Sequence, residues 1–147
     1  MFAQVTTVAF EGIEAKPVDV QVQIAPGMPA FTLVGLPDKA VAESRERVMR
    51  ARALQAERLA AAGNPRARTN AECDGALLEE IAAPDKAGMA LLREAADSLR
   101  LSARGYHRTL RVARTIADLD GDEGVRRVHV AEALSYRRET LQRQVAA

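Results

Sequence analysis

Four arginines stand close together in the segment from residue 101 to residue 121, ahead of its first acidic residue, Asp118. They are Arg104, Arg108, Arg111 and Arg114. At about 100° per residue of an α-helix, the first three fall within about 60° of one another, opposite an apolar arc, and Arg114 and His107 flank them. The apolar arc contains Tyr106, Thr109, Leu110, Ala113, Ile116 and Ala117. The segment therefore predicts a helix with one packed face and one cationic face.

Two interpretations of this cationic face are open. In the first, the face is solvated and its arginines pair with acidic residues on neighbouring helices, which periodicity alone favours. In the second, the arginines bind phosphate groups of a nucleotide or a nucleic acid. Planar guanidinium groups form bidentate hydrogen bonds with phosphate, and no acid offsets the arginine charge between residues 102 and 117.

The chain lacks the other parts of a phosphate-transfer site. A Walker A loop needs a glycine followed by a lysine, and none of the nine glycines is followed by lysine. Asp122 and Glu123 follow a glycine rather than an apolar strand, which is typical of a turn and not of a Walker B motif. The two histidines, His107 and His129, have too few partners for a catalytic set, and no second His, Cys or acid is spaced to form a metal site with His107. We expect His129 in the first turn of the last helix.

The first third of the chain has the period of β-strands. Apolar residues alternate with polar ones at Val18, Val20, Val22 and Ile24, the pattern of a strand with one buried face. The segments 4–10 and 30–35 predict two more strands, with turns at Gly12 and at Pro26–Gly27.

From residue 37 the period changes to that of α-helices. Residues 37–63 predict either one helix of about 25 residues or two joined helices, because the mean helix has about 11 to 12 residues. Shorter helices are predicted over residues 71–82, capped by Asn70, and over residues 85–100. Ser102 is expected to cap the arginine-rich helix, Gly121 and Gly124 to end it, and the last helix to cover residues 129–145. The predicted fold class is α+β, with a small N-terminal β-element of about three strands and a C-terminal bundle of about four helices.

The composition indicates a soluble chain with only local charge. The chain has 147 residues, and its 21 lysines and arginines nearly balance its 20 acids, so no overall field attracts nucleic acid or an anionic membrane. The single cysteine, Cys73, is interpreted as a small half-buried residue near a helix start. No targeting segment and no apolar run of about 20 residues is visible, so we expect a cytoplasmic location and no membrane partner. Because aromatic residues are scarce, the core is expected to consist of Ala, Leu, Val and Ile.

Two long segments resemble one protein family. Residues 6–48, TTVAFEGIEAKPVDVQVQIAPGMPAFTLVGLPDKAVAESRERV, resemble the start of the magnesium-chelatase-related AAA+ ATPases of the ComM type. The segment LSARGYHRTLRVARTIADLDG, followed by VHVAEALSYR, resembles the C-terminal domain of the same family, and RARALQAERLAA resembles the segment that leads into it. Together the matches cover residues 5 to about 138.

The resemblance implies a domain organisation and a role for the arginines. Residues 1–48 would be the start of a Lon-like N-terminal domain, and residues 49–147 the helical lid of an AAA+ ATPase. The ATPase core would be missing between them, at a junction near Val48–Met49, so we expect an internally deleted form, whether engineered or natural. The sequence SAR at residues 102–104 resembles the sensor-two motif. Arg104 would then contact the γ-phosphate of ATP, with Arg108, Arg111 and Arg114 supporting the same basic face.

For the full-length family, the resemblance implies ATP and magnesium as cofactors and a ring-shaped hexamer that drives DNA branch migration in natural transformation. For this chain we expect no catalytic residue, no metal site, no cofactor and no ATP hydrolysis. Its partner in the full-length protein would be the ATPase core, and nucleotide or DNA would bind weakly at most. The alternatives are a DNA-binding or oligomerisation module that uses the basic helix 102–119 and, less well supported, an independent enzyme. We also expect the apolar face of the strands to pack on the bundle, or on a second copy in a homo-oligomer or segment-swapped dimer.

Overall fold

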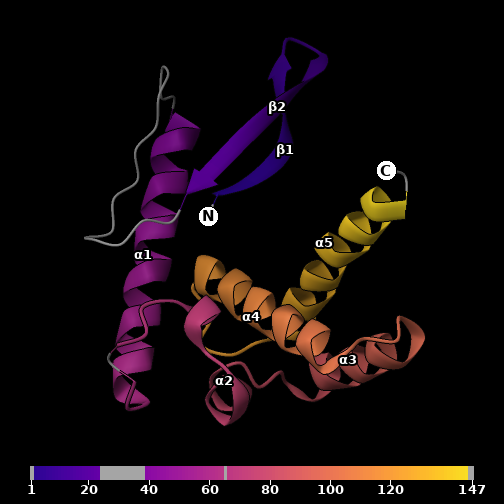
Figure 1. Ribbon diagram of the computed structural model, residues 1–147. Coiled ribbons are helices and arrows are strands. Elements are labelled where there is room, and N and C mark those ends of the chain that lie inside the picture. The colour runs from indigo at the N-terminus through magenta and orange to yellow at the C-terminus, as the bar shows by residue number, and fades with distance from the viewer. Residues whose placement is uncertain (1, 24–38, 65, 146–147) are drawn as a thin grey trace. The chain divides into compact units, whose positions relative to one another are not determined.

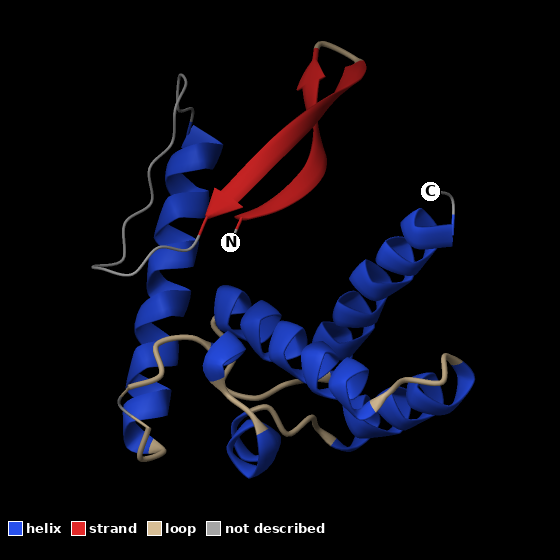
Figure 2. Cartoon of the chain, in the orientation of Figure 1, coloured by secondary structure: helices blue, strands red, loops and turns tan. Residues whose placement is uncertain are grey.

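A computed structural model describes residues 2–23, 39–64 and 66–145, which fall into two compact units (Figure 1). The first unit covers Met1–Ala30 and the second covers Phe31–Ala147. Both described strands, red in Figure 2, lie in the first unit, and all described helices, blue in Figure 2, lie in the second. This division confirms the predicted α+β fold class with a helical C-terminal part.

The first unit contains a hairpin of two antiparallel strands, β1 (Phe2–Glu11) and β2 (Glu14–Gln23). The register pairs Phe2 with Gln23 at the open end and Glu11 with Glu14 at the turn. The first residue of the connecting loop, Gly12, has a φ of 66°. Glycine adopts a positive φ without the clash that a Cβ atom would cause, and this position carries glycine in type II′ hairpins. The two strands and their turn therefore follow the sequence prediction.

Of the four residues on the predicted buried face of β2, the structure describes the exposure of Val18 alone. Val18 is 38% exposed, and every hairpin side chain that the structure describes is exposed. A two-stranded ribbon has no second layer of its own to cover one face, so the alternating pattern produced a strand without burying Val18. The predicted strand at residues 30–35 and the turn at Pro26–Gly27 lie outside the described residues. The packing of the apolar face on the bundle or on a second copy stays a prediction.

The first described element of the second unit is one long helix, α1 (Lys39–Ala61), of 23 residues. Its sequence is rich in Ala, Leu, Glu and Arg and has no Gly or Pro, a composition that favours an uninterrupted helix. Of the two alternatives from the sequence, the single helix is correct. The expected junction near Val48–Met49 falls inside this helix and stays a prediction.

The helix predicted over residues 71–82 begins later than expected. A short 3₁₀ turn, η1 (Asn70–Glu72), comes first, and α2 (Gly75–Ile81) follows. Its N-cap is Asp74, whose carboxylate accepts the N–H of Gly75 at 3.1 Å. The prediction that Asn70 caps this helix was therefore wrong. Asn70 is buried and its amide donates to Asp118 instead, a tertiary hydrogen bond that local sequence does not reveal.

Three further helices complete the unit: α3 (Lys86–Ser98), α4 (Ala103–Asp120) and α5 (Arg127–Val145). Helix α4 contacts α1, α2 and α5, and α5 also contacts α3. Ser102 caps α4 as predicted, because its hydroxyl accepts the N–H of Gly105 at 3.2 Å. At the other end Gly121 has a φ of 78°, and the N–H of Asp122 donates to the carbonyl of Ala117, as in a Schellman motif. The two ends of α4 thus follow from its cap residues.

The core of the second unit consists of small and aliphatic side chains, as predicted from the scarcity of aromatic residues. Its fully buried members include Leu59, Cys73, Leu78, Ala82, Leu92, Ala113, Ala117 and Val130. Cys73 is fully buried rather than half-buried, and burial raises the pKa of its thiol. Burying a leucine side chain stabilises a fold by about 1.5–3 kcal/mol, so this cluster fixes the helices around α4. Among the helices of the described ranges, none is both long enough and apolar enough to cross a bilayer.

Candidate functional site

Helix α4 carries the arginines singled out from the sequence, and its packed face forms as predicted. Tyr106 is half-buried, and the other members of the apolar arc are buried: Thr109, Leu110, Ala113, Ile116 and Ala117. Three further residues of α4 are also buried, and the sequence did not indicate them: Gly105, Arg114 and Asp118.

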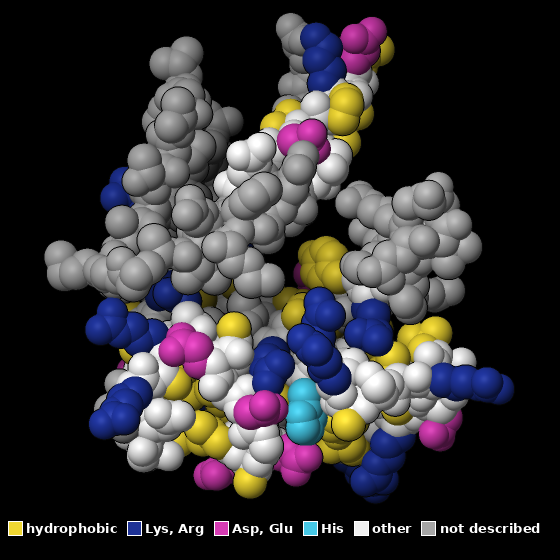
Figure 3. All heavy atoms as spheres, viewed as in Figure 1, with side chains coloured by type: hydrophobic (Ala, Val, Ile, Leu, Met, Phe, Trp, Pro, Cys, Tyr) yellow, Lys and Arg dark blue, Asp and Glu magenta, His cyan; other side chains and the backbone are white. Residues whose placement is uncertain are grey.

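Arg104 and Arg108 are exposed near the start of α4. They are four residues apart, so they lie on the same side of the helix. Neither side chain forms a hydrogen bond or an ion pair with another residue that the structure describes. Figure 3 shows a group of Lys and Arg side chains beside a histidine on the face in view. Because the side chains of Arg104 and Arg108 are exposed, both guanidinium groups can reach an anion in solution.

Arg111 pairs with the neighbouring helix, as the first interpretation of the cationic face expects. Its Nε atom donates to the carbonyl of Cys73 at 2.8 Å, and its Nη2 atom lies 2.9 Å from the carboxylate of Asp74. His107 faces the same carboxylate at 3.4 Å, and Glu79 lies 3.7 Å from its other ring nitrogen. Because Asp74 caps α2, these contacts join α2 to α4.

Arg114 lies inside the unit, away from the exposed face of Arg104 and Arg108. Its side chain is only 2% exposed. Its Nε atom donates to Asp118 at 3.1 Å, and its terminal nitrogens donate to the carbonyls of Glu123 at 2.7 Å and Asp122 at 2.6 Å. Burial lowers the pKa of Arg114, and the charge of Asp118 opposes this shift. Arg114 therefore holds the α4–α5 loop against α4.

Asp118 is the centre of a buried polar network that joins three elements. Its carboxylate accepts hydrogen bonds from Arg114, from the amide of Asn70 at 2.8 Å and from Arg58. Arg58 belongs to α1 and Asn70 to η1, so the network ties both elements to α4. Because two guanidinium groups and an amide surround this buried carboxylate, its charge is compensated.

The start of α4 also contacts α5, through a residue that the sequence analysis missed. A Cβ atom on the buried Gly105 would lie 2.7 Å from Nη2 of Arg137, so the Arg137 guanidinium group packs directly on this glycine. The Nε atom of Arg137 is buried and makes no hydrogen bond within the described part of the chain. A glycine in the first turn of a helix was the available signal, because it commonly marks the close approach of another group.

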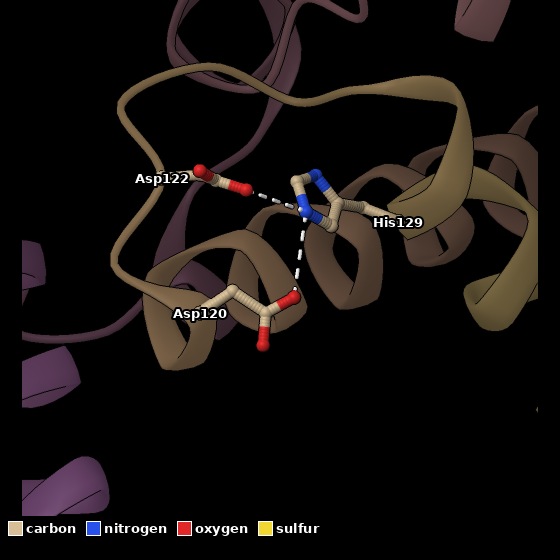
Figure 4. Close-up of side chains that lie close together, drawn as sticks. All are labelled: Asp120, Asp122 and His129. Carbon is tan, nitrogen blue, oxygen red and sulfur yellow. Dashed lines mark ion pairs between the residues drawn. The ribbon is translucent and has the colours of Figure 1, made fainter.

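Three further polar side chains, Asp120, Asp122 and His129, meet where α4 and α5 join (Figure 4). His129 lies in the first turn of α5 as predicted, and its Nε2 atom is 3.1 Å from Asp122 and 3.5 Å from Asp120. Its Nδ1 atom accepts the N–H of Arg126 at 2.9 Å, so the ring hydrogen of neutral His129 is on Nε2. With this tautomer, Nε2 has no lone pair to offer a metal ion.

The two carboxylates of this group also have cationic partners. Arg47 lies 3.2 Å from Asp120, and Arg126 donates a hydrogen bond to Asp122. The hydrogen bond from Arg126 holds the pKa of Asp122 below its ordinary value of 3.8. We therefore interpret the group as a polar cluster that fixes the start of α5, and not as a metal centre.

Comparison with known proteins places most of the helical unit in one family. A model of the family described as "Magnesium chelatase, subunit ChlI C-terminal" matches residues 38–137. The chain is 40% identical over 96 residues to Competence protein ComM of Haemophilus influenzae, a match that covers 65% of this chain and 18% of that protein. It is 42% identical over 105 residues to an uncharacterized protein of Mycobacterium tuberculosis, covering 71% and 20% of the two chains.

A third relative is the uncharacterized protein YifB of Escherichia coli, 34% identical over 112 residues, which are 76% of this chain and 20% of YifB. These matches confirm the resemblance for the C-terminal segment, and the resemblance of residues 6–48 to the start of the family stays a prediction. The chain spans about a fifth of the length of the curated relatives that it matches. The family match begins at residue 38, upstream of the domain boundary expected at residue 48.

Proposed function

The chain belongs to the family of magnesium chelatase subunit ChlI C-terminal domains, and on this premise we propose that its helical unit is the lid of an AAA+ ATPase, with Arg104 contacting the terminal phosphate of a nucleotide. One contrast within α4 carries the proposal. Arg111 and Arg114 have protein partners, whereas Arg104 is exposed on the first turn without a described partner. An arginine placed in this way forms charge-assisted hydrogen bonds with phosphate oxygens and loses them when the phosphate leaves.

The surroundings of Arg104 support the same role. Ser102 caps the helix two residues earlier, and the buried face of α4 fixes its backbone against the core. The side chain of Arg104 therefore projects from a rigid support. The partial positive charge at the N-terminus of α4 adds to the attraction for an anion.

The activity of the longer relatives is a second part of the proposal. We propose that they use this lid in an ATP-driven motor for DNA branch migration during natural transformation, with ATP and magnesium held mainly by the ATPase core. The name of one relative, Competence protein ComM, agrees with this role. The present chain has no glycine followed by lysine, and we propose that it does not hydrolyse ATP by itself.

A DNA-binding module built on residues 102–119 has less support. Binding to DNA without sequence preference grows with the number of phosphates that lysines and arginines neutralise. Arg111 and Arg114 are engaged within the protein, so only Arg104 and Arg108 of the original row remain for a DNA backbone. The nucleotide lid is therefore the function that we propose.

Nucleotide binding by the purified chain tests this function. We expect ATP to bind with a Kd on the order of 1 mM, because one arginine face leaves most phosphate oxygens to water. ADP should bind more weakly than ATP, since Arg104 would contact the terminal phosphate. In NMR titrations, Arg104→Gln should abolish the difference in affinity between ATP and ADP. Arg93→Gln, at an exposed arginine of α3, should leave it unchanged.

Two results would contradict the proposal. Equal affinity of the unaltered chain for ATP and ADP would exclude a sensing role for Arg104, and phosphate release from ATP by the pure chain would exclude a non-catalytic lid. A DNA affinity that weakens with salt, and falls when Arg104, Arg108 and Arg111 are all changed to alanine, would favour the DNA-binding module instead.

A further inference from the structure

The guanidinium group of Arg137 lies directly on the first turn of α4. A Cβ atom on Gly105 would lie 2.7 Å from Nη2, 3.1 Å from Cζ and 3.4 Å from Nη1 of Arg137. Three atoms of the guanidinium group thus face the glycine at distances that leave no room for a larger residue. Gly105 therefore brings a side chain of α5 to the same helix end that carries Arg104.

The half-buried Arg137 differs from the buried Arg114 in its hydrogen bonding. All three guanidinium nitrogens of Arg114 have acceptors, at 2.6–3.1 Å. The Nε atom of Arg137 is buried and has none within the described residues. A buried donor without an acceptor costs free energy, so the guanidinium group of Arg137, unlike that of Arg114, is not fully satisfied within the described residues.

Three arginines converge at this helix end. Arg104 precedes Gly105 and Arg108 follows it by one turn, so their Cα atoms lie within about 6 Å of each other along the axis of α4. No carboxylate in the described part of the chain pairs with Arg104, Arg108 or Arg137. Like charges held together repel one another, and an anion with several oxygens would relieve this repulsion. Polyphosphate fits best, because it offers more than one charge and several oxygens to planar guanidinium groups.

We infer that Arg137 is a second phosphate-contacting residue at the start of α4, where Arg104, Arg108 and Arg137 together bind the polyphosphate chain of a nucleoside triphosphate. The inference rests on the proposed lid function, because it adds a residue from α5 to the same site. Gly105 is required for this site, because its missing side chain lets the Arg137 guanidinium group reach the phosphates.

Binding of inorganic tripolyphosphate to the full chain, followed by calorimetry or NMR, tests this inference. Arg137→Gln should lower the affinity about tenfold, the loss expected for a charge-assisted hydrogen bond. The affinity of the Arg137→Lys variant should lie between those of the unaltered chain and of Arg137→Gln, because lysine keeps the charge but lacks the planar guanidinium group. Arg93→Gln on α3 removes one exposed arginine elsewhere and should leave the affinity unchanged.

Gly105→Ala provides a test that removes no charge. The methyl group would displace the Arg137 guanidinium group, so the affinity for tripolyphosphate should fall as in Arg137→Gln. Alanine favours a helix over glycine, and the displaced atoms belong to the end of a flexible side chain, so the variant should still unfold cooperatively. Thermal unfolding of each variant checks that the fold is retained.

The outcomes separate this inference from the proposed function. If Arg104→Gln lowers the affinity while Arg137→Gln and Gly105→Ala do not, the inference is overturned and the lid function stands. If Arg137→Gln lowers the affinity while Arg104→Gln does not, Arg137 stands as a phosphate-contacting residue, whereas the role of Arg104 falls both in this site and in nucleotide sensing. An unaltered chain that does not bind tripolyphosphate would overturn both.

Discussion

The two ends of helix α4 use the same residue type in opposite ways. Near its C-terminus, Arg114 is buried and donates to Asp118 and to two loop carbonyls. Near its N-terminus, Arg104 and Arg108 are exposed and have no partner within the described residues. One end holds the helical unit together, and the other presents charge to its surroundings.

This difference shows that the partners of an arginine decide its role, and not its position in a cationic row. A guanidinium group with all its nitrogens hydrogen-bonded contributes to stability, and its loss leaves buried acceptors unpaired. A guanidinium group without partners contributes little to stability and remains available to a ligand. Substitutions at the two ends should therefore separate stability from binding.

The largest effect is expected at the buried end. Asp118→Ala would leave Arg58, Arg114 and Asn70 without their shared acceptor, and it should lower the free energy of unfolding by about 3–5 kcal/mol. Urea denaturation followed by circular dichroism measures this change. Asp97→Ala, at an exposed acid of α3, should stay within about 0.5 kcal/mol of the unaltered chain. A loss below about 1 kcal/mol at Asp118 would mean that the network is not structural.

A smaller loss is expected from the cap at the opposite end. Ser102→Ala removes the acceptor of the Gly105 N–H and should cost about 1 kcal/mol in thermal or urea unfolding. Ser135→Ala lies on the exposed surface of α5 and should cause no loss, because alanine favours a helix. If both serine variants unfold alike, Ser102 does not stabilise the start of α4.

Part of the stability that the fold loses at low pH should come from the α4–α5 loop. The hydrogen bond from Arg126 lowers the pKa of Asp122 in the folded state, so this pair stabilises the fold above about pH 4 and loses its effect as pH falls through the lowered pKa. Because the pair is partly exposed, its effect should be smaller than that of the cap. In the Asp122→Asn variant, the free energy of unfolding measured with urea should decrease less than in the unaltered chain as the pH is lowered below about 4. An unchanged pH profile would contradict this contribution.

The smallest effect on stability is expected at the exposed arginines. The double variant Arg104→Gln and Arg108→Gln should unfold within about 0.5 kcal/mol of the unaltered chain, because no described contact is lost. Arg114→Gln, the same exchange at the buried end, should be clearly destabilising. Equal losses at the two ends would remove the distinction between structural and ligand-facing arginines.

Local signals in the sequence were enough for most elements of the fold. Ser102 and Gly121 predicted the two ends of α4, and the alternation at residues 17–24 predicted β2. These signals work because capping and strand alternation depend on neighbours in the chain. The cap of α2 was missed because the amide of Asn70 bonds to Asp118, a residue distant in sequence, which left Asp74 to cap the helix.

The amino-acid sequence by itself determined the helical character of residues 39–145, the apolar face of α4, the row of arginines and the family resemblance. Only the tertiary structure decided that Arg114 turns inward, that Arg111 pairs with Asp74 and that Arg137 meets Gly105. Helical periodicity states on which side of a helix a residue lies. Which charges and backbone atoms lie on that side depends on how distant segments pack. That packing decides whether the guanidinium group of an arginine finds hydrogen-bond acceptors within the protein or remains available to a ligand.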